Sequence, residues 1–202
     1  MTTGILILVA SYILGGIPFG YLLVKWTRGQ DVRASGSGNI GATNVLRTAG
    51  RAAGITTLAL DIAKGYAAVW LAGLLTGESP LWMSAAAVAV MLGHAFPAAL
   101  KFKGGKAVAT CVGAFLARAP AALGIAVIVF VGTVVLSRFI SLGSILSAVS
   151  LPLAVWLVVH PPAPVITAAV FAAVFVIWRH KSNIQRLLAG NENVFSFGGR
   201  AH

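Results

Sequence analysis

Long apolar runs separated by short polar segments constrain the fold of this 202-residue chain more than any other feature. A transmembrane helix needs roughly 20 consecutive, mainly apolar residues. Runs close to that length lie at 4–24, 53–76, 81–99, 119–137, 140–159 and 163–179, and a shorter run lies at 106–117. The sequence therefore predicts an all-α, polytopic membrane protein.

The composition agrees with this interpretation. Apolar residues make up 58% of the chain and charged residues 9%, against roughly 25% charged in soluble domains. Such a chain leaves no room for a separate soluble domain, so we predict a single transmembrane domain over 1–202. The N-terminal run lacks the basic start of a signal peptide and is expected to be the retained first span.

The distribution of Lys and Arg predicts the topology. Residues 106–117 could form a short tilted helix, a re-entrant segment or the first half of a helix broken before Pro120. If this segment crosses, one side of the membrane carries Lys25, Arg28, Arg33, Arg47, Arg51, Lys101, Lys103, Lys106, Arg138, Arg179, Lys181, Arg186 and Arg200. The other side carries only Arg118. The positive-inside rule then predicts seven transmembrane helices, with the N-terminus outside and the C-terminus in the cytoplasm.

Polar clusters gather on the predicted cytoplasmic side. They lie at 34–51, 101–110, 138–144 and 180–192, whereas the outer connections are short. We therefore expect a site that faces the cytoplasm at the membrane interface. The net charge of +11 would suggest nucleic acid in a soluble protein, but here it is explained by topology, and no nucleic-acid partner is expected.

The first polar cluster combines hydrogen-bond donors with interleaved glycines. Its candidate substrate-binding residues are Ser35, Ser37, Asn39, Asn44 and Arg47. Hydroxyls, amides and a guanidinium all donate to oxyanions, and glycines let the backbone approach a ligand. The pattern predicts a phosphate-binding loop; the alternative is a flexible polar loop whose glycines only form turns.

The second cluster is Gly104-Gly105-Lys106, ahead of an apolar helix. A phosphate at a helix N-terminus gains from free N–H groups and the helix dipole. The segment is not a Walker A motif, because GxxxxGK[ST] is absent. The alternative is a basic anchor that contacts lipid head groups.

The remaining clusters flank the last two spans. His180 and Asn183 are three residues apart and share a helix face, with Arg186 farther round. His180 could be catalytic or structural. Ser141 and Ser144 are spaced to share a face, and they could add donors or merely cap the helix.

Two intramembrane features have structural alternatives. Asp61 and Lys64, three residues apart inside a span, favour an ion pair that braces the bundle over a functional role. His94 could bind substrate or donate to a carbonyl freed by Pro97. With four acidic residues and one cysteine, Cys111, no cluster has metal-ligand spacing, so neither metal nor other cofactor is expected.

Three segments closely resemble the bacterial acyl-phosphate:glycerol-3-phosphate acyltransferases, the PlsY-type integral membrane family. They are SGNIGATNVLR from Ser37, GHAFPAALKFKGGKAVAT from Gly93 and HKSNIQRLLAGNE from His180. Their order and spacing match the family over almost the full length. Ala107 stands where Gly is common, and Ser182 stands where an acidic residue is frequent.

The resemblance implies acyl transfer from acyl phosphate to the 1-hydroxyl of sn-glycerol 3-phosphate, giving lysophosphatidic acid and phosphate in phospholipid synthesis. The implied location is the bacterial cytoplasmic (inner) membrane. The implied partners are membrane lipid, the two substrates and, transiently, a soluble enzyme that produces acyl phosphate. Two rival functions are transport of a small phosphorylated anion and acyl transfer from a thioester.

The motif match also implies residue roles. His180, Asn183 and Lys106 are the expected catalytic residues, with Ser37, Arg47 and Lys106 binding phosphate and Gly104 and Gly105 supplying backbone donors. Substrate binding is further expected of Ser35, Asn39, Asn44, Ser141, Ser144, Arg186 and Glu192. No carboxylate pairs obviously with His180, so a substrate phosphate oxygen could accept the hydroxyl proton.

Overall fold

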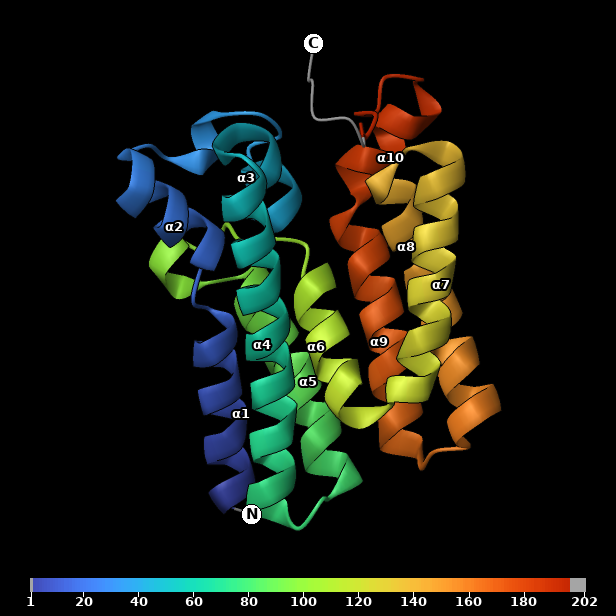
Figure 1. The fold of residues 1–202 in the computed structure, drawn as a ribbon. Helices are drawn as coiled ribbons and strands as arrows, with labels where there is room; N and C mark the ends of the chain where they lie inside the picture. The colour runs from blue at the N-terminus through green and yellow to red at the C-terminus, as the bar shows by residue number, and fades with distance from the viewer. Residues whose placement is uncertain (1, 197–202) are drawn as a thin grey trace. The chain divides into compact units, whose positions relative to one another are not determined.

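The computed structural model describes residues 2–196, and all its regular elements in that range are helical (Figure 1). They are α1 (Thr2–Gly15), α2 (Phe19–Arg28), η1 (Val32–Ala34), α3 (Ala42–Ala49), α4 (Arg51–Thr76), α5 (Pro80–Ala95), η2 (Ala98–Leu100), α6 (Val108–Arg118), α7 (Pro120–Ser137), α8 (Ile140–Ala154), η3 (Val155–Val159), α9 (Ala163–Arg179) and α10 (Lys181–Leu188). The chain divides between Arg118 and Ala119 into two compact units.

In the first unit, α4 packs against α1, α5 and α6. Glycines set how closely α4 and α6 approach. A Cβ built on Gly65 would overlap the carbonyl of Thr110, and one built on Gly113 would overlap the carbonyl of Ile62. Small residues at such crossings let membrane helices gain van der Waals contact, because lipid provides no hydrophobic driving force between them.

The first predicted span, 4–24, is interrupted. Helix α1 ends at Gly15 and α2 begins at Phe19, because Pro18 has no N–H to continue the helical ladder. The chain from Thr2 to Arg28 is still apolar enough as a whole to be one candidate span. Helix α2 is amphipathic, with Val24 buried and Trp26 78% exposed.

The polar loops of the first unit share one end. Figure 1 shows α2 and α3 at the end opposite the N-terminus. A buried apolar cluster joins these segments to the loop after α5; its members are Val24, Val32, Ile40, Val45, Ala49 and Leu100. The predicted gathering of 34–51 and 101–110 at one end is therefore confirmed for this unit.

In the second unit, α8 packs against both α7 and α9. Pro152 lies inside α8, and the helix continues as a π-helical turn over Val155–Val159. Helices α9 and α10 meet at 57°. The Phe195 N–H donates to the Arg138 carbonyl at 2.7 Å, so the segments around 138 and 195 share one end of this unit.

Five helical segments of the described residues are long and apolar enough to cross a membrane, or six if α9 and α10 form one span. Helix α6 has 11 residues and rises only ~16 Å, against a hydrocarbon core of ~30 Å. The spans predicted at 53–76, 119–137, 140–159 and 163–179 coincide closely with observed helices. Seven crossings and the orientation of the termini stay predictions, and Arg200 lies outside the described residues.

Candidate active site

Asn44 organises the first polar loop. Its side chain is buried, and Nδ2 donates to the carbonyls of Val32, Ser35 and Asn39 at 3.1, 3.1 and 2.8 Å. Its Oδ1 accepts from the Ser37 N–H at 2.8 Å. Asn44 was predicted to bind substrate; the contacts instead indicate a residue that holds the loop in shape.

Other predicted binding residues of this loop face outward. Ser35, Ser37 and Arg47 are exposed residues at this end of the unit. The Asn39 Oδ1 accepts from the Gly41 N–H at 2.8 Å, just ahead of α3. Gly36 has φ +60°, and a Cβ there would overlap Asn44 Oδ1, so the tight loop requires glycine.

Two further cations of this end have structural contacts. Arg28 donates to the Thr48 and Ala49 carbonyls at the C-terminus of α3, at 3.0 and 2.5 Å. Arg33 pairs with Asp31 at 2.7 Å, and its side-chain hydrogen bonds hold the pKa of the Asp31 carboxyl below its usual value. The sequence analysis used both arginines only as topology signals.

The Gly104-Gly105-Lys106 segment is anchored to the end of α5. The Gly104 N–H donates to the Ala95 carbonyl at 3.0 Å, and the Gly105 N–H donates to the His94 carbonyl at 3.1 Å. These two bonds close the loop onto the end of α5, and the role of the two glycines as phosphate donors stays a prediction. Lys106 is half-buried, and α6 begins two residues later.

Ala107 carries a conformation that favours glycine. Its φ is +60° and it is fully buried. The glycine that the family resemblance leads us to expect here would adopt this conformation without the penalty that an L-residue pays in the left-handed region.

In the second unit, His180 lies buried where α9 ends and α10 begins. Its Nδ1 lies 2.8 Å from the Val176 carbonyl. A carbonyl can only accept, so Nδ1 carries the hydrogen, and in the neutral ring Nε2 is the acceptor. This tautomer suits a histidine that receives a hydrogen bond from a hydroxyl.

Glu192 holds two of the predicted site residues. Its Oε1 accepts from Asn183 Nδ2, and its Oε2 accepts from Arg186 Nε, both at 2.8 Å. Asn183 and Glu192 are 5% and 9% exposed. Glu192 was predicted to bind substrate; the contacts indicate that it orients Asn183 and Arg186, since a carboxylate would repel a phosphate.

The two candidate serines of α8, Ser141 and Ser144, are buried. Ser144 Oγ donates to the Ile140 carbonyl at 2.9 Å, a bond within the helix, and neither serine caps α8, whose N-cap residue is Phe139. Ser141 Oγ has no hydrogen-bond partner. A buried hydroxyl without a partner is costly, so Ser141 is the better placed of the two to receive a ligand.

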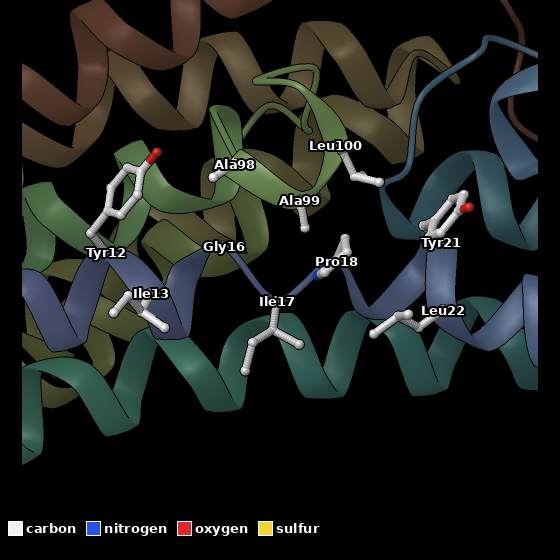
Figure 2. Close-up of a pocket in the computed structure, with 10 residues that line it drawn as sticks. All are labelled: Tyr12, Ile13, Gly16, Ile17, Pro18, Tyr21, Leu22, Ala98, Ala99 and Leu100. Carbon is white, nitrogen blue, oxygen red and sulfur yellow. The ribbon is translucent and has the colours of Figure 1, made fainter.

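An apolar groove of about 480 Å³ opens at the break between α1 and α2 (Figure 2). Figure 2 shows the short η2 segment facing this break. The groove is lined by Tyr12, Ile13, Gly16, Ile17, Pro18, Tyr21, Leu22, Ala98, Ala99 and Leu100. At its α2 end, the Arg33 guanidinium lies 5.0 Å from the Tyr21 ring centroid.

The structure thus brings the predicted site residues together within each unit. In the first unit a buried apolar cluster joins the loop of residues 35–47 to Leu100, ahead of 104–106; in the second, the Phe195 N–H donates to the Arg138 carbonyl, which joins the segment after Glu192 to the start of α8. Among residues 2–196, no three His, Cys, Asp or Glu side chains are placed to hold a metal ion. The groove has no signature in the sequence, because its walls come from segments some 80 residues apart.

Comparison with known proteins gives the family. Residues 5–190 match the family described as Glycerol-3-phosphate acyltransferase. Glycerol-3-phosphate acyltransferases from Desulforamulus reducens and Geobacter metallireducens are 47% and 50% identical, over 94% of both chains for the first and over 96% of this chain and 99% of the other for the second.

A solved structure agrees. The crystal structure of PlsY, an integral membrane glycerol 3-phosphate acyltransferase in its glycerol 3-phosphate form, matches with a TM-score of 0.91 and 36% identity over 96% of both chains. The family match covers the first two motif segments in full and the third as far as residue 190. This integral membrane protein therefore belongs to the glycerol-3-phosphate acyltransferase family of phospholipid biosynthesis.

Proposed function

We propose that this protein transfers a fatty acyl group from acyl phosphate to the 1-hydroxyl of sn-glycerol 3-phosphate. The products are lysophosphatidic acid and inorganic phosphate. The family accounts for glycerol 3-phosphate and acyl transfer; the acyl-phosphate donor and the product are part of the proposal. One matching solved structure is described as the lysophosphatidic acid form of PlsY, at a TM-score of 0.88 and 34% identity.

The observation that carries the proposal is the contact of 2.8 Å between His180 Nδ1 and the Val176 carbonyl. Nδ1 donates to this carbonyl, so the neutral ring can receive a hydrogen bond from the attacking hydroxyl at Nε2. Asn183 and Arg186, oriented by Glu192, lie on the following helix and can hold the acceptor substrate. In the proposal, His180 and Asn183 act on the acceptor, and the buried Ser141 and Ser144 assist in binding.

Phosphate is held by the first unit. Arg47 and Lys106 supply positive charge, and Ser35 and Ser37 supply hydroxyl donors. The hydroxyl oxygen attacks the acyl carbon, the bond from that carbon to the phosphate oxygen breaks, and the departing phosphate takes up the hydroxyl proton. Because acyl phosphate is a mixed anhydride with a good leaving group, the reaction needs neither a metal ion nor a covalent enzyme intermediate. Electrostatic stabilisation by fixed cations is then the largest contribution of the protein.

The groove at the α1–α2 break suits the acyl chain. Its walls are apolar, and its volume of about 480 Å³ lies within the usual range for ligand pockets. Tyr21 and Leu100 connect it to the apolar cluster beneath the first polar loop. Arg33, at the Tyr21 end, is already paired with Asp31, so the proposal assigns the phosphate head to Arg47 and Lys106 and only the acyl tail to the groove.

The proposal includes a location. We place the polar ends on the cytoplasmic side of the bacterial inner membrane. There the polar glycerol 3-phosphate can arrive from water and the acyl phosphate, with its apolar chain, from the lipid. The basic loops there offer a surface for transient contact with a soluble enzyme that produces acyl phosphate. No nucleic-acid partner and no cofactor enter the proposal.

The test is an assay of purified protein with acyl phosphate and glycerol 3-phosphate, followed for phosphate release and lysophosphatidic acid together. We expect equal amounts of both products. Lys106→Ala and Arg47→Ala should each lose a charge-assisted phosphate contact of ~1.5–3 kcal/mol, or about ten- to a hundredfold in kcat/KM.

The donor is tested with the same preparation. Acyl-CoA and acylated acyl carrier protein should give no appreciable product, because a thioester presents no phosphate at the bond that breaks. A kcat/KM for acyl-CoA comparable with that for acyl phosphate would contradict the proposed donor.

A further inference from the structure

Helix α4 carries a buried ion pair in its apolar part. Asp61 and Lys64 are 2% and 3% exposed, and Lys64 Nζ lies 2.8 Å from Asp61 Oδ1. The predicted ion pair is therefore confirmed. Charges inside a membrane span are costly and persist mainly where they are paired or have a function.

Lys64 also reaches the break between α1 and α2. Its Nζ donates to the Ile17 carbonyl at 2.9 Å and lies 5.5 Å from the Phe19 ring centroid. The Ile17 carbonyl lies where Pro18 interrupts the helical ladder, and Lys64 supplies it with a hydrogen-bond donor. One end of the ion pair thus holds the interruption of the first span.

Asp61 faces the other way, toward α5. Its Oδ1 lies 3.6 Å from Nδ1 of His94, which is 5% exposed near the C-terminal end of that helix. An ion pair that only braced the bundle would not require a histidine at this position. The imidazole lies between the ion pair of α4 and the loop that follows α5.

The loop that follows α5 leads to Lys106. A Cβ built on Gly105 would overlap His94 Nε2, so the ring packs directly against this glycine. The Gly105 N–H donates to the His94 carbonyl, and the Gly104 N–H donates to the Ala95 carbonyl. Both the side chain and the backbone of the His94 turn therefore fix the residues that immediately precede Lys106.

We propose that Asp61, Lys64 and His94 form a positioning network that sets the place of Lys106 through the backbone of Gly104 and Gly105. None of the three is a catalytic residue in this account. The network holds the loop, and the loop presents the lysine. Its connection to turnover rests on the phosphate-binding role proposed above for Lys106.

The first test needs no activity. Hydrogen exchange, read by mass spectrometry, is measured for peptides that contain the Gly104 and Gly105 amides. In the wild-type protein these amides should be protected, because both are hydrogen-bonded. His94→Ala should speed their exchange by about tenfold or more, and Asp61→Asn should act in the same direction.

Two variants make this test specific. His94→Asn keeps an N–H donor near the position of Nδ1 and should restore much of the protection. Ser84→Ala removes a buried polar group of the same helix outside the network and should leave the exchange of this loop unchanged. Unchanged exchange in His94→Ala would overturn the proposal.

The second test is a double-mutant cycle between His94 and Gly105. Gly105→Ala alone should displace the loop, because its methyl group overlaps the imidazole. In a His94→Ala background the same substitution should cost much less, since the space is then empty. Equal costs in both backgrounds, read as the exchange rate or the inhibition constant of inorganic phosphate, would also overturn the proposal.

The third test connects the network to turnover. His94→Ala should raise the KM of the phosphate substrate and the inhibition constant of inorganic phosphate in parallel, by about tenfold, with a smaller change in kcat. A fall in kcat alone would contradict positioning of a binding lysine. If the wild-type protein transferred no acyl group, the proposed function would fail, while the exchange measurement would still decide the network.

Discussion

At the residue scale, several polar side chains of the motifs hold other groups in place. Asn44 makes four hydrogen bonds to the backbone of its own loop. Glu192 accepts from both Asn183 and Arg186. Motif residues in this chain therefore divide into side chains that present donors outward and side chains that fix those donors.

Glu192 offers a test of this division. Glu192→Ala leaves Asn183 and Arg186 without their acceptor and should lower kcat/KM by about ten- to a hundredfold, at ~1.5–3 kcal/mol for charge-assisted contacts. Glu192→Gln keeps one amide oxygen that can accept from Asn183, so its loss should be smaller. The measurement is the KM for glycerol 3-phosphate at saturating donor. A wild-type KM in Glu192→Ala would remove this residue from the site.

The Asp31–Arg33 pair predicts a pH dependence of the first polar loop. Because the Arg33 hydrogen bonds lower the folded-state pKa of Asp31, the pair stabilises the protein above the unfolded pKa of Asp, ~3.9. This contribution is lost as the pH falls through the lower folded-state pKa.

Asp31→Asn should therefore reduce stability slightly at pH 7, by ~0.2–1 kcal/mol for a partly exposed pair, and the difference from wild type should vanish in strong acid. Thermal unfolding in detergent between pH 7 and pH 3 measures this. A difference that grows as the pH falls would contradict the sign.

At the element scale, the packing of α4 on α6 depends on glycine. A side chain at Gly65 has no space, because the Thr110 backbone lies directly opposite. Gly65→Val should destabilise the protein by ~1–3 kcal/mol through overpacking. Gly132 lies in α7 with open space where a Cβ would stand, so Gly132→Val is the matched control.

The readout is the midpoint of thermal unfolding in detergent. Gly65→Val should unfold at a clearly lower temperature than wild type, and Gly132→Val should stay close to it. Equal midpoints for the two variants would show that the close approach of α4 and α6 does not limit stability.

The groove at the α1–α2 break predicts a dependence on acyl-chain length. Ala99 is exposed in the short η2 segment that forms one wall, so Ala99→Phe should fill the groove without disturbing the fold. It should lower kcat/KM about tenfold for a long-chain acyl phosphate and little for a short-chain one, because only a long chain would occupy the space that the phenyl ring takes.

The control for that variant is Ala63→Phe, at an exposed position of α4 that does not line the groove. The kcat/KM values for acyl phosphates of increasing length give the comparison. Equal losses for short and long chains, or no loss for either, would exclude this groove as the acyl site.

At the scale of the whole molecule, topology is the main prediction. Thirteen of the 15 Lys and Arg residues fall on one side in the seven-span arrangement, Arg200 among them, although that residue lies outside the described part of the chain. Reporter fusions should place the C-terminus in the cytoplasm and the turn at Glu78-Ser79 outside. A C-terminal reporter active only outside the cytoplasm would contradict the arrangement.

Much of the architecture could be predicted from the sequence, because the length and apolarity of a segment are local properties. The observed limits of α4, α7 and α9 lie close to the predicted spans. The Asp61–Lys64 pair could also be predicted, since residues three apart on a helix are neighbours by geometry alone. The motif segments identified the family for the same reason, because they are contiguous in the chain.

The tertiary structure alone decided which groups those motifs contact. The N–H groups of Gly104 and Gly105 are used by the end of α5, and Glu192 reaches back to Asn183 across a turn. His94 lies between an ion pair some 30 residues earlier and a loop ten residues later. Such contacts depend on how helices pack and where they are interrupted. The sequence shows that a residue has a donor, but it does not show which acceptor the packing places next to it.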